Sequence, residues 1–240
     1  MKILSLNLWR YYDWEHRFQN IVNSILEKRP DVIFLQEVQL DKEKSYFSQV
    51  EILKKELQEY KYSIFSVVVV KTHQRGQRLK NPVQHGMAVL SKYPIINSFN
   101  YFLKLSEDEK ENRSILCFDI EKDGKIEKMA NIHFGNRENW AKRQLEEFIN
   151  FLKLRNEKRV MVGDFNLFKM TEYGEIFKGY NLSYNFKKYQ SFKEGYENGK
   201  MVEKNGTLDY ILIPDNYKFK SLEVLEKYLS DHKALFAEIN

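Results

Sequence analysis

Hydrophobic residues near the N-terminus first cluster, then recur with helical spacing, and then form a second continuous run. Residues 2–8, "KILSLNL", are typical of a strand, and residues 31–38, "DVIFLQEV", are typical of a buried strand. Between them, apolar residues occupy one face of a helix that Pro30 ends: Trp14, Phe18, Ile21, Val22, Ile25 and Leu26. A strand, a helix and a strand in this order predict parallel pairing of the two strands.

The rest of the chain alternates between strand and helix patterns. The alternation over 113–134, interrupted by Asp123-Gly124, predicts a β-hairpin. Residues 139–156 predict an amphipathic helix with these residues turned inward: Trp140, Leu145, Phe148, Ile149 and Leu152. The other segments are a helix at about 42–60, strands at 62–70, 87–96 and 158–164, and terminal strands at 207–214 and 232–239. We expect no regular structure at 71–86, and a mobile loop or a loose hairpin at 184–206.

No repeat, low-complexity tract or linker divides the chain, so we expect one domain over residues 1–240. Hairpins mixed with helical crossovers indicate the α/β class. They favour two mixed β-sheets packed face to face with helices outside.

Composition narrows the function only slightly. Hydrophobic residues make up 42% and charged residues 30%, which is ordinary for a globular protein. A net charge of +5 weakly favours anionic partners. Cys117 is the single cysteine, and its alternating segment predicts a buried core thiol. No apolar run approaches the ~18–20 residues of a membrane span, so we expect a cytoplasmic monomer without stable membrane insertion.

Polar residues follow or end many of the expected strands. They are Asn7, Glu37, His133, Asp164, Asn166, Asp209 and the "SDH" of 230–232. Taken singly, each has an ordinary interpretation as a turn former or a structural histidine. Asp164 and Asn166 are two positions apart, however, so an extended chain aims both to one side. The recurrence of these residue types at strand ends predicts a site where the strand ends converge.

The residue types suit a hard divalent cation and a phosphate. Mg²⁺ prefers oxygen ligands and takes only one or two protein carboxylates beside water and substrate phosphate. Asn7, Glu37 and one of the late aspartates fit that role, whereas no Cys/His cluster has zinc spacing. Adjacent Asp231 and His232 face opposite ways in an extended segment. We therefore expect Asp209 to orient His232, which leaves Asp231 free to approach the metal.

The series "LNLW", "LQEV", "NIHF", "GDFN", "LDYIL" and "SDHKAL" resembles the endonuclease/exonuclease/phosphatase family from Asn7 to His232. The resemblance implies a four-layer α/β sandwich and hydrolysis of phosphoesters with Mg²⁺, or Mn²⁺ in its place. It also implies roles by position. The metal residues are Asn7, Glu37 and Asp231. The catalytic residues are Asp164 for water, Asn166 and His133 for the phosphate, and the Asp209–His232 pair.

Three segments are candidates for substrate binding. Trp9 and Tyr11 follow Asn7 and offer rings for stacking, although packing explains them equally well. Lys71, Arg75 and Arg78 form a basic segment that could follow a phosphate backbone or simply face solvent. Arg113 resembles a phosphate-contacting arginine of some family members.

The leading hypothesis is a Mg²⁺-dependent phosphodiesterase of nucleic acid, acting on DNA ends or single strands. A second interpretation keeps the chemistry but assigns a lipid headgroup, a phosphoinositide or another small phosphoester as the substrate. A third is a non-catalytic binding module on the same fold, which would be expected to have lost part of the metal and base set.

Overall fold

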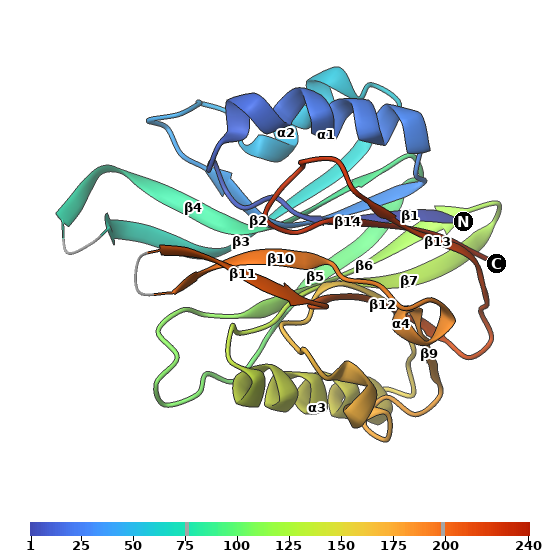
Figure 1. The fold of residues 1–240 in the computed structure, drawn as a ribbon. Helices are drawn as coiled ribbons and strands as arrows, with labels where there is room; N and C mark the ends of the chain where they lie inside the picture. The colour runs from blue at the N-terminus through green and yellow to red at the C-terminus, as the bar shows by residue number, and fades with distance from the viewer. Residues whose placement is uncertain (75–76, 198–199) are drawn as a thin grey trace.

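The computed structural model describes residues 1–74, 77–197 and 200–240 and has helices on both sides of two stacked β-sheets (Figure 1). The first sheet has six strands in the order β13-β14-β1-β2-β4-β3, and the second has six in the order β5-β6-β7-β8-β12-β9. Strands β10 and β11 form a separate pair. This arrangement confirms the predicted α/β sandwich with two mixed sheets.

The strands are β1 (Lys2–Asn7), β2 (Val32–Leu40), β3 (Tyr62–Gln74), β4 (Gln77–Ser91), β5 (Ile95–Phe102), β6 (Ser114–Lys122), β7 (Lys125–His133), β8 (Val160–Asp164), β9 (Tyr180–Leu182), β10 (Phe192–Glu197), β11 (Lys200–Gly206), β12 (Asp209–Pro214), β13 (Phe219–Leu225) and β14 (Ala234–Ile239). The α-helices are α1 (Trp14–Lys28), α2 (Gln49–Glu56), α3 (Glu138–Leu154) and α4 (Ser183–Phe186), and a 3₁₀ turn, η1, spans Met170–Tyr173.

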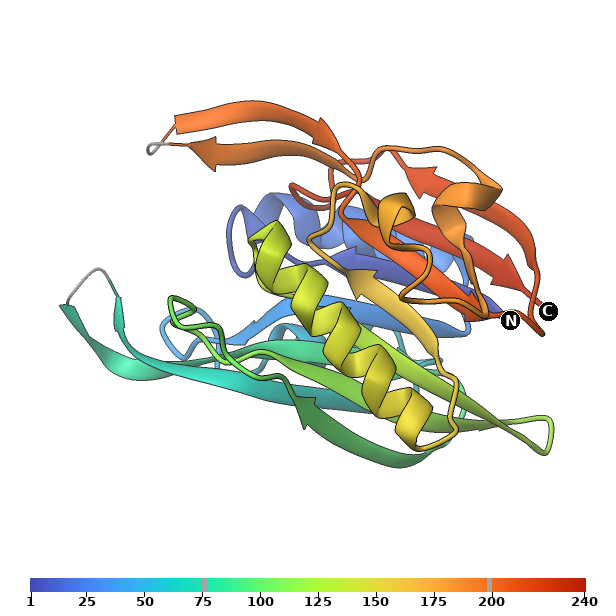
Figure 2. The same cartoon turned by 90° about the horizontal axis from the view of Figure 1, so that it is seen from below.

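Each large sheet contains a parallel pair joined by a helical crossover. Strands β1 and β2 pair in parallel and are connected by α1, as the sequence predicts. Strands β7 and β8 pair in parallel and are connected by α3. Figure 2 shows α3 lying across the second sheet, on the side away from the first.

Period-two alternation divides the apolar residues among three cores. In β1, Leu4 and Leu6 face α1 and α2, whereas Ile3 faces the second sheet. In β8, Met161 packs toward α3, whereas Val160 and Val162 face the first sheet. Both strands therefore have an outer side that packs against helices and an inner side that forms the core between the sheets. The predicted inward face of the 139–156 helix is buried, and so is Cys117.

Several expected elements differ from the structure. Residues 71–86 belong mostly to β3 and β4, which pair down to Gln74↔Gln77 as a long hairpin, so the expectation of no regular structure there is wrong. The helix expected at about 42–60 is only α2, because a capping box of Ser48 and Glu51 starts it late. The short strand β9 and the edge strand β13 were not predicted. In the 184–206 segment, β10 and β11 form a hairpin.

Both hairpins, β3–β4 and β10–β11, project at the same end of the molecule (Figures 1 and 2). No helix within the described ranges is both long and apolar enough to cross a membrane.

Candidate active site

Neighbouring strands of the second sheet place three titratable side chains in one row. In the pairing register, Asp164 at the end of β8 lies between His133 of β7 and Asp209 of β12. All three continue the inner faces of their strands, because residues an even number of positions away belong to the inter-sheet core: Met129 four positions from His133, and Val162 and Ile211 two positions from Asp164 and Asp209. The row therefore lies where the apolar core between the sheets gives way to polar side chains.

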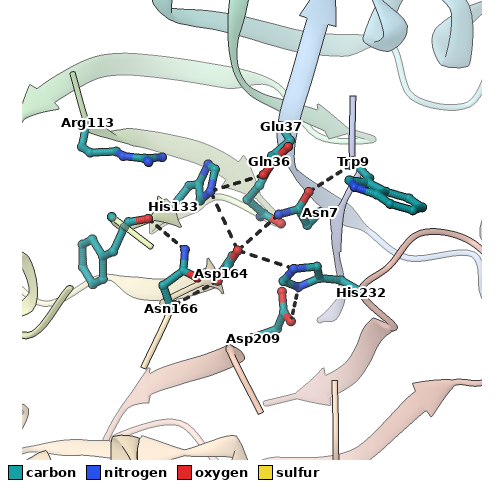
Figure 3. A network of polar contacts seen from close by, with 12 residues as sticks. Asn7, Trp9, Gln36, Glu37, Arg113, His133, Asp164, Asn166, Asp209 and His232 are labelled. Atoms are coloured by element: carbon teal, nitrogen blue, oxygen red, sulfur yellow. Dashed lines mark hydrogen bonds and ion pairs between the residues drawn. The ribbon is translucent and has the colours of Figure 1, made fainter. Parts of the chain in front are cut away.

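The first sheet contributes Asn7 to the same point. Asn7 continues the inner face of β1, and its Nδ2 donates a hydrogen bond to Asp164 Oδ2 at 3.2 Å (Figure 3). Its Oδ1 accepts a hydrogen bond from the backbone N–H of Trp9. The carboxylate of Asp164 is thus held from the opposite sheet.

His232 and Asp209 form a pair, as expected from the sequence. His232 Nδ1 lies 2.8 Å from Asp209 Oδ2, and His232 Nε2 lies 3.9 Å from Asp164 Oδ2 (Figure 3). Burial lowers the pKa of His232, but the negative charges of Asp209 and Asp164 outweigh it and raise the pKa well above its usual value. The imidazole is therefore a cation held between two carboxylates.

Asp164 itself is nearly inaccessible to solvent. Burial raises the pKa of its carboxyl group, and His232 opposes that shift. A carboxylate with a raised pKa accepts a proton more readily than an exposed one, which suits a general base.

Glu37 reaches the site through a β-bulge rather than from the end of a strand. The pairing of β2 with β4 shifts register between Leu35 and Val38, and Glu37 has a φ of 53°. Without the bulge, strict alternation would turn Glu37 to the outer face of the sheet with Leu35, because Gln36 faces inward. The strand expected over 31–38, with Glu37 near its end, is confirmed but runs two residues further, to Leu40.

The charge of Glu37 is stabilised by a neighbouring guanidinium. Arg10 Nε donates a hydrogen bond to Glu37 Oε2 at 2.8 Å. Burial alone would raise the pKa of Glu37, but the charge of Arg10 is the main opposing influence, and the pKa falls to about 2. Glu37 is therefore ionised at neutral pH.

Left-handed backbone conformations gather around the site. Trp9, Arg10, Glu37 and Asn166 have φ between 51° and 54°. This conformation is costly for residues other than glycine, and such strain concentrates at functional sites. The Asn166 backbone N–H donates to Asp164 Oδ1 at 2.9 Å, and its side chain donates to the Phe134 carbonyl at 3.0 Å.

His133 lies against two acids without hydrogen-bonding either. Its Nε2 is 3.8 Å from Asp164 Oδ2 and 3.9 Å from Glu37 Oε1. Burial, together with the charge of Arg113, lowers the pKa of His133 well below its usual value, so the ring is neutral.

These side chains open into a cleft of about 610 Å³. The cleft is lined by these predicted residues: Trp9, Glu37, Arg113, His133, Asp164, Asn166, Asp231 and His232. Asp231 accepts a hydrogen bond from Ser230 Oγ at 2.9 Å, and burial raises the pKa of its carboxyl group. Asn7 and Asp209 lie directly behind, bonded to Asp164 and His232.

The other candidate substrate residues lie elsewhere. Tyr11 lines a separate pocket and donates a hydrogen bond to the Phe47 carbonyl at 3.2 Å. Lys71 forms an ion pair with Glu111 at 2.7 Å, so Glu111 in the cleft wall partly neutralises it. Arg78 is exposed on β4, and Arg75 lies outside the described residues.

The sequence pattern of the Endonuclease/Exonuclease/phosphatase family matches residues 4–232. The chain belongs to this family. The activities in the family's name all hydrolyse phosphoric esters, so the chain is a hydrolase of that class. A comparison with curated proteins returned no significant match.

Solved structures of low sequence identity share the family fold. A family protein from Leptotrichia buccalis C-1013-b has a TM-score of 0.76 at 21% identity, covering 100% of this chain and 99% of its own. D. rerio TDP2 in complex with a single-strand DNA product has a TM-score of 0.71 at 18% identity, covering 100% and 98%. Sphingomyelinase C from Streptomyces griseocarneus has a TM-score of 0.66 at 18% identity, covering 99% and 98%.

Two sets of side chains in the described part of the chain offer ligands for a metal ion. Ligand atoms of Asp164, Asp209 and His232 lie within 4.8 Å of one another. A metal there would have to displace the proton of His232 and break its bond to Asp209, so this set is a poor fit. The carboxylates of Glu37 and Asp231 also line the cleft, and the charge of Glu37 acts on Asp231. Carboxylate oxygens facing an open space fit a hard divalent cation.

Three contributors to the site were not predicted from the sequence: Arg10, His85 and the bonded pair Gln36 and Asn131. Arg10 neutralises Glu37, as described above. His85 of β4 lines the cleft although its segment was expected to lack structure. Gln36 Nε2 donates to Asn131 Oδ1 at 2.7 Å, and this buried bond joins the two sheets beneath the site. The "NIH" motif already placed Asn131 on the same strand face as His133, so alternation would have identified it.

Proposed function

We propose that this chain is a Mg²⁺-dependent phosphodiesterase that hydrolyses nucleic acid at strand ends or within single strands. One observation carries the proposal: Asp164 lies at the meeting point of Asn7, His133, His232 and Asp209, on the wall of an open cleft. A buried base, an imidazolium and a neutral imidazole around one point suit attack of water on a phosphate.

Each residue has a separate task in this mechanism. Asp164 accepts the proton of the attacking water, and Asn7 holds the carboxylate in place. His232, kept cationic and oriented by Asp209, stabilises the negative charge that develops on the phosphate oxygens. His133 and Asn166 position the phosphate. Glu37 and Asp231, with Asn7 nearby, would hold Mg²⁺, which supplies charge neutralisation at the phosphate and the leaving oxygen when bound.

The lining of the cleft supports a polynucleotide substrate. Trp9 lines the cleft with a partly exposed ring, beside the mostly buried Trp140 and Phe192. Three guanidinium groups also line it, each paired with an acid: Arg10 with Glu37, Arg113 with Glu109 and Arg137 with Asp108. Bases stack on aromatic side chains for about 1–3 kcal/mol each, and guanidinium groups bind the phosphates between them. D. rerio TDP2, which shares the fold, was solved with a single-strand DNA product.

A substrate panel tests the proposal. Purified protein is incubated with Mg²⁺, Mn²⁺ or EDTA and with labelled single-stranded DNA, RNA, a 5′-tyrosyl oligonucleotide or sphingomyelin. We expect cleavage of an oligonucleotide that needs the metal and is lost in Asp164→Ala. Cleavage of sphingomyelin alone would replace nucleic acid with a lipid headgroup as substrate, and no cleavage with either metal would favour a binding module.

A further inference from the structure

A second, much smaller pocket adjoins the cleft beside His133. Its volume is about 20 Å³, and His85, Glu111, Arg113 and His133 line both it and the cleft. This space accommodates a single oxygen-sized group and is too small for a phosphate. A group bound there would sit next to a phosphate held by His133.

Three residues that line this pocket have an unpartnered polar atom. In the described part of the chain, His85 Nε2, Arg113 Nε and Ser114 Oγ are buried without a hydrogen bond, and all three residues line the pocket. Arg113 Nε lies 3.4 Å from Glu109 Oε1 but makes no hydrogen bond with it. Buried polar atoms are costly unless a partner satisfies them, so the pocket is built for an oxygen that both donates and accepts.

The sandwich architecture explains why these atoms meet. His85 lies on the inner face of β4, two and four residues before Met87 and Val89, and Ser114 begins the inner face of β6, two residues before Leu116. The two residues come from opposite sheets and meet at the edge of the inter-sheet core. The two residues are only 5% and 1% exposed, and both line the pocket, so a group bound in the pocket is placed to be their partner.

We propose that His85, Ser114 and Arg113 form a subsite for a sugar hydroxyl next to the scissile phosphate, which in nucleic acid is the 2′-hydroxyl of a ribonucleotide. This inference rests on the proposed function and adds a preference for ribose over deoxyribose. A hydroxyl both donates and accepts hydrogen bonds and has the size of the pocket. A site whose buried polar groups bind a hydroxyl rejects the analogue that lacks it, because those groups then stay unpaired.

The test compares single-stranded oligonucleotides of one sequence. One strand is all DNA, one carries a single ribonucleotide, and one carries a 2′-fluoro nucleotide at that position. Wild-type protein should cleave beside the ribonucleotide with a kcat/KM at least about tenfold above that for the same bond in the other two strands. Asp164→Ala protein, prepared in parallel, corrects for contaminating ribonuclease.

Variants of the subsite should reduce this ratio. His85→Leu and Ser114→Ala should each bring the ratio of the kcat/KM values close to one. Ser114→Ala removes only one oxygen, so it serves if His85→Leu does not fold. His16→Leu is the matched control, because His16 is exposed and bonded to Asp13 outside the cleft, and it should keep the wild-type ratio.

The outcomes separate the subsite from the function. Equal wild-type rates on the three strands, or a ribonucleotide preference that survives in both variants, would overturn the subsite and leave the phosphodiesterase proposal standing. Absence of cleavage of every strand by wild-type protein would overturn the proposed function, and the subsite with it.

Discussion

At the scale of single residues, the site depends on side chains whose charge is set by their neighbours. His232 is a cation because Asp209 and Asp164 face it, and Glu37 stays ionised because Arg10 bonds it. Without these neighbours, burial would lower the pKa of His232 and raise the pKa of Glu37, because burial opposes the charged form of each group. The charge of His232 therefore depends on its two neighbouring aspartates, and the charge of Glu37 depends on Arg10.

The Asp209–His232 pair should act as one unit. We expect Asp209→Asn and His232→Ala each to lower kcat by about 10²–10⁴-fold, because either change removes the oriented imidazolium. The double variant should be little worse than His232→Ala, which steady-state kinetics with Mg²⁺ would establish. Asp215→Asn is the control, since Asp215 pairs with Lys158 away from the cleft. If the fold-losses in kcat of the two single variants multiplied in the double variant, Asp209 and His232 would not act as one unit.

At the scale of elements, local irregularities aim the functional groups. The bulge in β2 turns Glu37 toward the cleft. In β8, Gly163 has a φ of 141°, and an added Cβ would lie 2.2 Å from the Ile132 carbonyl oxygen. Only glycine permits this close approach between β8 and β7, which brings Asp164 beside His133.

Gly163→Ala should therefore destabilise the fold as well as the site. We expect a loss of about 2–4 kcal/mol in the free energy of unfolding, from backbone strain and the clash with a carbonyl that cannot yield. Denaturant unfolding followed by circular dichroism measures it. Gly174→Ala is the matched control, because its nearest neighbour would be 3.7 Å away, and it should change stability by less than ~0.5 kcal/mol. Equal stability of the two variants would refute the argument.

At the scale of the whole molecule, the cleft lies at one edge of the inter-sheet core. Phe192 at the base of the β10–β11 hairpin and His85 on β4 border it. Both hairpins project from that end of the sandwich (Figure 2). A long anionic strand bound in the cleft would extend past its rim, whereas a small phosphoester would touch only the cleft floor.

This geometry predicts different salt dependence for long and small substrates. For a single-stranded oligonucleotide, kcat/KM should fall about tenfold or more between ~50 and ~200 mM KCl, because bound phosphates release counterions. For bis(4-nitrophenyl) phosphate, which carries one charge, the change should be much smaller. Initial rates at fixed Mg²⁺ would measure both. A shallow dependence for the oligonucleotide would argue for the headgroup or small-phosphoester alternative.

Much of the fold was predictable because alternation and helical spacing are local properties. The α1 crossover, the β6–β7 hairpin and α3 follow directly from apolar spacing and the Asp123-Gly124 turn. The β3–β4 hairpin was missed because its polar residues are typical of a loop. Its strand pairing depends on a partner strand that apolar spacing does not reveal.

The sequence alone indicated which side chains would form the site, since Asn7, Asp164 and Asp209 lie at strand ends and His232 lies just before β14. The tertiary structure decided how they combine. The register places Asp164 between His133 and Asp209. A bulge in β2 turns Glu37 toward the cleft. The stacking of the two sheets brings His85 and Ser114 to one pocket. The physical reason is the distance along the chain over which each property is set. The face of a strand that a side chain occupies depends on its neighbours in the sequence, whereas register, bulges and shared burial arise only when distant strands pack together.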